Sequence, residues 1–200
     1  MKKGSFISLI LIIIGGLLII VAGWNMLETK IETTKSLNEA KEIIRYREQD
    51  KKVNEDKETL AVSKIDPEIG ETFGILSIPA IDAELPIVEG TDPDELEKGV
   101  GHYRGSFYPG EDGQIVLSGH RDTVFRQAGK LKLGDELMVK IASGDYKYQI
   151  INTKIVDSDD TSIITLQDNE EELLLTTCYP FSYVGNAPER YIIYAQRVEN

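Results

Sequence analysis

The stretch from Phe6 to Trp24 has 19 residues and no charged side chain, and it constrains everything that follows. As a helix rising about 1.5 Å per residue it spans roughly the 30 Å of a bilayer's hydrocarbon core. Lys2 and Lys3 precede it and no positive excess follows, so the positive-inside rule predicts a cytoplasmic N-terminus and an extracellular body. We therefore expect residues 1–24 to be a single-pass membrane anchor. A cleaved signal peptide, with its shorter apolar region of about 7–15 residues, is the alternative.

Residues 25–68 form a charged segment that could hardly build a core. Up to residue 64 the segment lacks glycine and proline, and its apolar residues are sparse. Oppositely charged side chains lie within reach of one another, which favours a solvated helix or partial disorder. We expect a stalk that lifts the body off the membrane, with a regulatory arm folded over the active site as the alternative.

The folded body is expected to be all-β and to occupy residues 69–200. Short segments rich in β-branched and aromatic residues alternate with glycine, proline and Ser-Gly-Asp turns, at residues 73–78, 83–88, 114–118, 136–141, 146–156, 173–177 and 191–198. Seven or eight such strands in about 130 residues predict a β-barrel or a sandwich. One short helix is expected at Thr91–Lys98, with Asp92 as its cap, Pro93 in its first turn and Gly99 at its end.

The body is strongly acidic, which narrows its partners. Residues 69–200 carry 11 basic and 23 acidic side chains, in a chain whose net charge is −12. This balance argues against nucleic acid as a partner. The segment Asp157–Glu172 holds seven of the carboxylates around an apolar patch; a wall of a substrate groove or a calcium site is conceivable, but its spacing matches no calcium loop, and a solvated acidic loop is the simpler interpretation. We expect no metal and no cofactor.

The single cysteine, Cys178, lies at the end of the apolar strand pattern LLLTTCYPF. Pro180 cannot continue the ladder, so the strand should stop near the thiol. In an extracellular body an unpaired cysteine is either buried as a small hydrophobe or used in chemistry. Placement at a strand end favours a nucleophile.

A cysteine nucleophile needs a base and a stabiliser for the oxyanion that acyl transfer generates. The chain contains two histidines, His102 and His120, and spacing alone does not choose between them. His120 ends a strand just as Cys178 does, which favours it. Arg190 opens the last strand twelve residues after the cysteine, and a hairpin would set the two side by side; a surface ion pair with Glu189 is the alternative for this arginine.

Three motifs, LSGHRDT, LLTTCYPF and APERYIIYA, follow one N-terminal anchor in this order. Together they resemble the sortases of Gram-positive bacteria, and most closely class D. Class C sortases usually carry a C-terminal membrane segment and a lid with an Asp-Pro-aromatic motif; here the chain ends at Asn200, and Asp66-Pro67 and Asp92-Pro93 are followed by acidic residues. Class E stays open.

The resemblance implies an eight-stranded sortase-type β-barrel with one or two short helices, behind a membrane helix and a charged stalk. It implies that Cys178 cleaves an LPXTG-like sorting signal between Thr and Gly or Ala, with His120 as acid and base and Arg190 holding the substrate or its oxyanion. An amine, usually of a peptidoglycan precursor, would resolve the thioacyl intermediate. Further substrate contacts are expected from Thr177, Ile163, Ile164 and Leu166. His102 fits better as a barrel residue.

Two other functions remain open. One is a secreted cysteine peptidase that hydrolyses its thioacyl intermediate, and the other is a stalked β-domain that binds surface ligands without chemistry. Acceptance of an amine separates the first from a transpeptidase, and reactivity of the Cys178 thiol separates the second.

Overall fold

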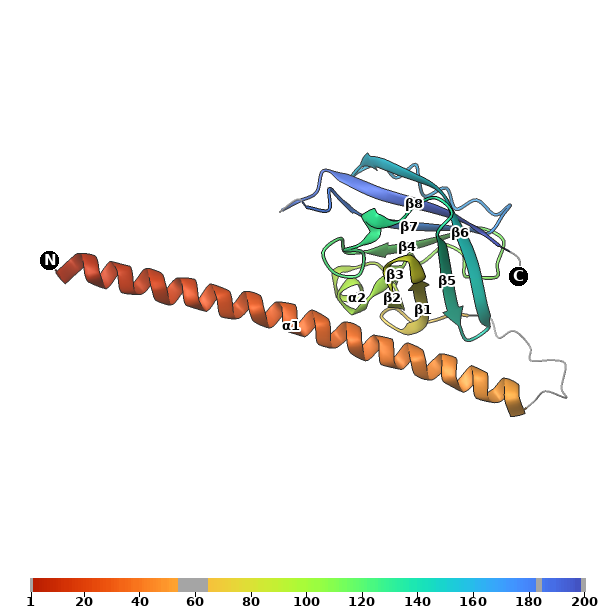
Figure 1. The fold of residues 1–200 in the computed structure, drawn as a ribbon, viewed down its shortest axis with the longest axis horizontal. Helices are drawn as coiled ribbons and strands as arrows, with labels where there is room; N and C mark the ends of the chain where they lie inside the picture. Colours follow the sequence, from red (N-terminus) through yellow and green to blue (C-terminus); the bar gives the residue numbers. More distant parts are fainter. Residues whose placement is uncertain (1, 54–64, 183–184, 199–200) are drawn as a thin grey trace.

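The computed structural model describes residues 2–53, 65–182 and 185–198, which form one long helix and a closed β-barrel (Figure 1). Helix α1 (Lys2–Val53) covers the apolar stretch and most of the charged segment without a break. Its described part from Ser8 to Asp50 is long and apolar enough to cross a membrane, and none of the apolar window is buried. The helix is therefore compatible with a membrane anchor or a signal.

The barrel has eight strands in the order β1-β2-β3-β4-β7-β8-β6-β5, and β5 closes it against β1. The pairs β2–β3 and β4–β7 are parallel and the others antiparallel, so the sheet is mixed. The bounds are β1 (Thr72–Ile78), β2 (Ala83–Glu89), β3 (Val100–His102), β4 (Gln114–Gly119), β5 (Glu136–Ile141), β6 (Gly144–Asp157), β7 (Glu172–Tyr179) and β8 (Glu189–Arg197). The expected eight-stranded barrel is confirmed.

Seven of the strands match the sequence pattern to within a few residues. The exception is β3, whose three residues are too few to show a periodic signal. Gly101 lets this strand approach its neighbour, because a Cβ there would lie 2.3 Å from the carbonyl oxygen of Gly90. The predicted turn at Ser143-Gly144-Asp145 joins β5 to β6 as a hairpin.

Short helical segments connect the strands. Helix α2 (Pro93–Lys98) lies between β2 and β3, and two 3₁₀ turns lie at Pro79–Ile81 and Ala128–Lys130. The predicted side-chain cap of Asp92 is wrong: the Asp92 side chain makes no cap hydrogen bond, and its backbone carbonyl accepts from Glu95 and Leu96 instead. Proline in the first turn and Gly99 at the end bound the helix as expected.

Alternating side chains divide the sheet into an inner and an outer face. On β7, Leu173 and Leu175 belong to the main core inside the barrel, whereas Leu174 packs in a second cluster with Val116, Val156, Ile163 and Ile192. Because successive strand residues point to opposite faces, this second cluster marks the outer face of β4, β7 and β8. The outer face carries the candidate site.

Candidate active site

Strand alternation places Cys178, His120 and Arg190 on the same outer face. Leu174 lies on this face, so Cys178, four residues further along β7, does too. In the parallel ladder Ser118 pairs with Thr176, and continuing this register by two residues brings His120 level with Cys178. In the antiparallel ladder Cys178 pairs directly with Arg190, as the predicted hairpin requires.

The three side chains line one cavity of about 400 Å³ at the end of the barrel. All three are partly buried, so they remain accessible from the cavity. Loops complete its wall, and the lining residues are His120, Arg121, Asp122, Ser158, Cys178, Gly185, Asn186, Ala187 and Arg190. A thiol, an imidazole and a guanidinium in one solvent-accessible cavity are the groups that thiol acyl transfer requires.

The turn after β4 fixes the position of His120. The Phe125 amide donates to the His120 carbonyl oxygen at 3.0 Å, and the Phe125 ring is buried in the main core. Gly119 makes room for this ring, because a Cβ at Gly119 would lie 2.6 Å from it. A larger residue at Gly119 would therefore force the Phe125 ring or the turn itself to shift.

The guanidinium of Arg190 is oriented by the loop that precedes it. Its Nη1 donates to the carbonyl oxygens of Ala187 at 3.3 Å and Glu189 at 3.0 Å. Within the described residues no carboxylate forms an ion pair with Arg190, and the contact with Glu189 is to its backbone rather than its carboxylate. The positive charge is therefore not neutralised by a neighbouring acid.

Arg121 also lines the cavity, although no sequence pattern singles it out. Its Nη1 donates to the Pro180 carbonyl oxygen at 3.3 Å and its Nη2 to that of Gly185 at 2.7 Å. It thereby joins the turn that carries His120 to the connection between β7 and β8. Only adjacency to His120 in the sequence could have suggested this role.

The four expected substrate contacts differ in how they are placed. Thr177 is buried, and its hydroxyl donates to the Gly119 carbonyl oxygen at 2.7 Å, which links β7 to β4 next to Cys178 and His120 in the chain. Ile163 is buried against the outer face, Ile164 packs beside it, and Leu166 is exposed with a left-handed backbone at φ 48°. Their roles in substrate binding stay predictions.

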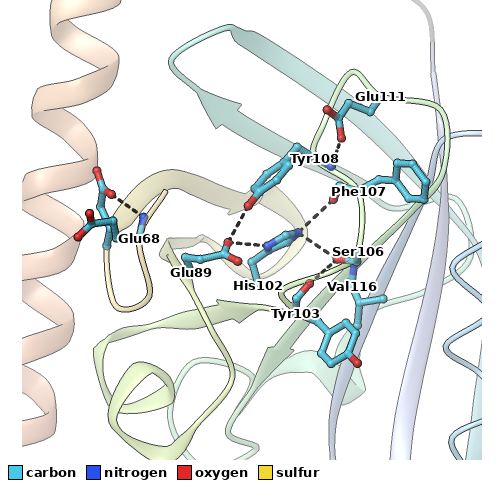
Figure 2. A network of polar contacts seen from close by, with 10 residues as sticks. Glu68, Glu89, His102, Tyr103, Ser106, Phe107, Tyr108, Glu111 and Val116 are labelled. Carbon is cyan, nitrogen blue, oxygen red and sulfur yellow. Dashed lines mark hydrogen bonds and ion pairs between the residues drawn. The ribbon is translucent and has the colours of Figure 1, made fainter. Parts of the chain in front are cut away.

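The other histidine, His102, lies inside a closed polar network (Figure 2). Its Nδ1 is 2.7 Å from Oε2 of Glu89, and both side chains are fully buried. Its Nε2 lies 3.0 Å from the Phe107 carbonyl oxygen and 3.0 Å from the Ser106 hydroxyl. Tyr108 donates a further hydrogen bond to Glu89 at 3.2 Å.

Counting donors fixes where the protons of this network lie. The Ser106 hydroxyl donates to the Tyr103 carbonyl oxygen and accepts from the Val116 amide, so its own proton is committed. The Nε2 of His102 must therefore carry a proton to satisfy Ser106 and Phe107. Both ring nitrogens of His102 therefore have partners, and His102 is not among the residues that line the cavity.

Within the described residues, no group of three His, Cys, Asp or Glu side chains is placed to hold a metal ion. The carboxylates near the end of the acidic loop make protein contacts instead. The Glu171 carboxylate accepts a hydrogen bond from Tyr148 and forms an ion pair with Arg197. The Glu172 carboxylate accepts a hydrogen bond from Gln114. Burial, reinforced by Glu171, raises the pKa of the Tyr148 phenol well above its usual value.

A closed mixed barrel thus holds a cysteine, a histidine and an arginine in one cavity, an arrangement compatible with thiol chemistry. The chain belongs to the sortase family, because residues 76–198 match the model of the sortase domain. An aligned region of 115 residues is 71% identical to sortase D of Bacillus subtilis (strain 168) and covers 58% of this chain. The chain spans 58% of the length of that curated relative.

Solved structures agree with this placement. A Clostridium perfringens sortase D5 transpeptidase superposes with a TM-score of 0.68 at 27% identity, covering 84% of this chain and 99% of that chain. A Clostridium perfringens sortase C, solved with the C-terminal cell wall sorting motif, gives a TM-score of 0.62 at 28% identity, with 84% and 89% coverage.

Proposed function

We propose that this chain is a membrane-anchored sortase of the class D type, which cleaves an LPXTG-like sorting signal between Thr and Gly or Ala and transfers the protein to a cell-wall amine. The observation that carries the proposal is the register of β4, β7 and β8, which sets His120, Cys178 and Arg190 together on one face of the sheet. The similarity to sortase D supports the class.

In the first half of the reaction, the Cys178 sulfur attacks the carbonyl carbon of the threonine, and the thiol proton passes to His120. The resulting oxyanion lies against the Arg190 guanidinium, whose charge is free to stabilise it. His120 then gives its proton to the leaving nitrogen of the next residue. The C–N bond breaks, and the threonine remains as a thioester on Cys178.

In the second half, an incoming amine attacks the thioester carbonyl. His120 accepts the proton that the amine loses and returns it to the departing Cys178 sulfur, so the enzyme is restored and a new amide bond has formed. His120 therefore moves a proton from the Cys178 sulfur to a nitrogen in the first half, and from a nitrogen back to the sulfur in the second half. The natural amine is proposed to belong to a peptidoglycan precursor.

The substrate class is supported by a relative rather than by this structure. The Clostridium perfringens sortase C is described with a C-terminal cell wall sorting motif, and the sortase D5 of that organism is described as a transpeptidase. Ile164 and Leu166, at the edge of the outer face, remain proposed substrate contacts, as do the more deeply placed Ile163 and Thr177.

Helix α1 supports the proposed membrane location. We propose that residues 1–24 are the anchor, 25–68 the stalk and 69–200 the catalytic domain, which faces the outside of the cell. The exposed apolar window of α1 and the two lysines before it support this orientation.

The test is a cleavage assay with the full chain in lipid nanodiscs and a library of LPXTG-type peptides, read by mass spectrometry. With an added amine such as triglycine, the expected product is the amide adduct of the threonine fragment. If the threonine fragment is released with a free C-terminal carboxylate in place of the adduct, the enzyme is a peptidase instead. A Cys178 thiol that resists alkylation, with no cleavage of any peptide, would favour a binding module.

A further inference from the structure

The charged half of α1 lies along the barrel rather than projecting away from it. Ala40 is fully buried and Ile44 is 7% exposed, and both pack with Leu37 against Ile75 of β1. Ile75 points outward while Leu76 and Ile78 enter the main core, so β1 is covered on both faces. The helix is thus a covering element of the sheet and not only a tether.

Polar contacts fix the helix at both ends of this apolar seam. At one end the Thr33 hydroxyl donates to the Glu97 carbonyl oxygen of α2 at 3.0 Å. At the other end Arg47, with its side chain 8% exposed, donates to the Ile141 carbonyl oxygen at 2.8 Å and pairs with Asp145 at 2.6 Å. The contacts span about 21 Å of helix, at 1.5 Å per residue.

A nearly buried arginine is strong evidence for a defined position. Its charge would be costly to bury unless the partners were fixed, and here a carboxylate and a carbonyl oxygen meet it in the β5–β6 hairpin. Between the two ends, Lys41 pairs with Glu84 of β2 at 2.7 Å, and this lysine lowers the pKa of the Glu84 carboxyl.

These contacts also define which end of the barrel lies toward the N-terminus of α1 and which toward its C-terminus. The β5–β6 hairpin meets α1 near its C-terminal end, at Arg47. At the opposite end, Thr29–Thr34 share a cavity of about 600 Å³ with the turn Asp122–Arg126, which begins two residues after His120. Figure 1 shows the end of β7 and the beginning of β8 on this same side, toward the N-terminal half of α1.

The catalytic cavity therefore lies at the barrel end nearer the apolar half of α1. From Trp24, the last residue of the apolar stretch, to the segment 29–34 is 5–10 residues, or about 8–15 Å along the helix axis. No break interrupts α1 between the two regions. A helix that is embedded in the bilayer at one end and packed against the barrel at the other sets the height of the cavity above the bilayer. It also sets the direction in which the cavity faces.

We propose that residues 33–47 of α1 are a docked spacer that holds the catalytic cavity close to the bilayer and facing it, so that the enzyme selects peptides tethered to the same membrane. The proposal rests on the proposed function and on the membrane anchor. It assigns the charged segment a role in substrate selection, which a simple stalk would lack.

The first test changes the height without touching the docking contacts. Seven helix-forming residues inserted between Leu27 and Glu28 raise the barrel by about 10 Å and leave its rotation within about 20°. In proteoliposomes, we expect turnover of a signal peptide tethered close to the lipid to fall at least fivefold. Turnover of the soluble peptide should stay unchanged, and a linker about 10 Å longer should restore the tethered reaction.

The outcomes separate this proposal from the proposed function. If the parent chain cleaves neither peptide, the transpeptidase assignment fails. If the parent cleaves both and the insertion variant cleaves the closely tethered peptide at the parental rate, the spacer proposal is overturned.

The second test releases the docking itself. Arg47→Glu sets a carboxylate against Asp145 and Ile141. Arg45→Glu is a matched control at an exposed arginine whose ion pair, among the described residues, is with Glu42 of the same helix. In nanodiscs, we expect hydrogen exchange in residues 33–47 to speed up at least tenfold in Arg47→Glu but not in the control. Equal exchange in the two variants would contradict the docked helix.

Discussion

The two histidines of this chain lie in opposite kinds of environment. His102 is fully buried, and both of its ring nitrogens have partners inside the barrel. His120 is partly buried on the outer face, where it shares a cavity with Cys178 and Arg190. Residue type and placement at strand ends are similar, so the difference arises from which face of the sheet each side chain occupies. A satisfied histidine stabilises a fold, whereas an accessible one can move protons.

Removing the proposed nucleophile, Cys178, should have the largest effect on activity. We expect Cys178→Ala to lower the rate of peptide cleavage by about 10³–10⁶-fold, because no other group can form the thioester. Circular dichroism should show an unchanged fold, since the thiol is only partly buried. Residual cleavage above about a tenth of the parental rate would place the nucleophile elsewhere.

Removing the buried histidine should affect stability rather than chemistry. His102→Ala leaves the Glu89 carboxylate and Ser106 without their partner, and we expect the free energy of unfolding to fall by about 3–5 kcal/mol. Urea unfolding measures the loss. The kcat of the fraction that remains folded should stay within about twofold of the parent, and a much larger drop in kcat at parental stability would reverse the assignment of the two histidines.

The arginine of the cavity can be compared with another arginine on the same strand. Arg190→Ala should lower kcat/KM about 10²–10³-fold, the usual cost of losing an oxyanion donor. Arg197→Ala is the matched control, because Arg197 pairs with Glu171 away from the cavity and stacks over Tyr146. We expect the control to lose stability and keep its turnover; equal kcat/KM losses in the two variants would count against an oxyanion role.

Arg121 should have a smaller effect, through the position of His120. Without its bonds to Pro180 and Gly185, the turn and the β7–β8 connection can separate, and we expect kcat to fall about tenfold with KM changed less. Arg121→Lys should recover part of the loss, because one donor remains. Loss confined to KM would indicate a direct contact with substrate instead.

The smallest expected effect is the response of the buried network to alkaline pH. Burial raises the pKa of the Tyr108 phenol, and the nearby Glu89 carboxylate raises it further. The folded state therefore keeps a proton that the unfolded chain loses above about pH 10, so this stabilisation is present below that pH and is lost as pH rises. The free energy of unfolding between pH 9 and 11 should fall more steeply in the parent than in Tyr108→Phe; parallel curves would contradict this.

Local chemistry in the sequence was sufficient to predict much of the fold and the pairing of Cys178 with Arg190. The stop at Pro180 and the short hairpin from Cys178 to Arg190 involve neighbours in sequence, so their pairing could be predicted. Placing His120 beside them depends on the parallel β4–β7 ladder, whose strands are over 50 residues apart. Strand-end placement was only an indirect sign of it.

Other features depend on contacts that no local pattern announces. The Glu89–His102 pair forms across neighbouring strands, and Arg121 reaches carbonyl oxygens about 60 residues away. The docked face of α1 presents only Leu37, Ala40 and Ile44, which in the sequence are too few to distinguish a covering helix from a solvated stalk. These features depend on packing between residues far apart in the sequence, which composition does not reveal.

The most direct test of the account is the effect of His120→Ala on cleavage and on stability, measured together on one preparation. If the accessible histidine moves the protons, kcat/KM for an LPXTG-type peptide falls about 10²–10⁴-fold, while the free energy of unfolding stays within about 0.5 kcal/mol of the parent. Parental turnover in His120→Ala would contradict the account.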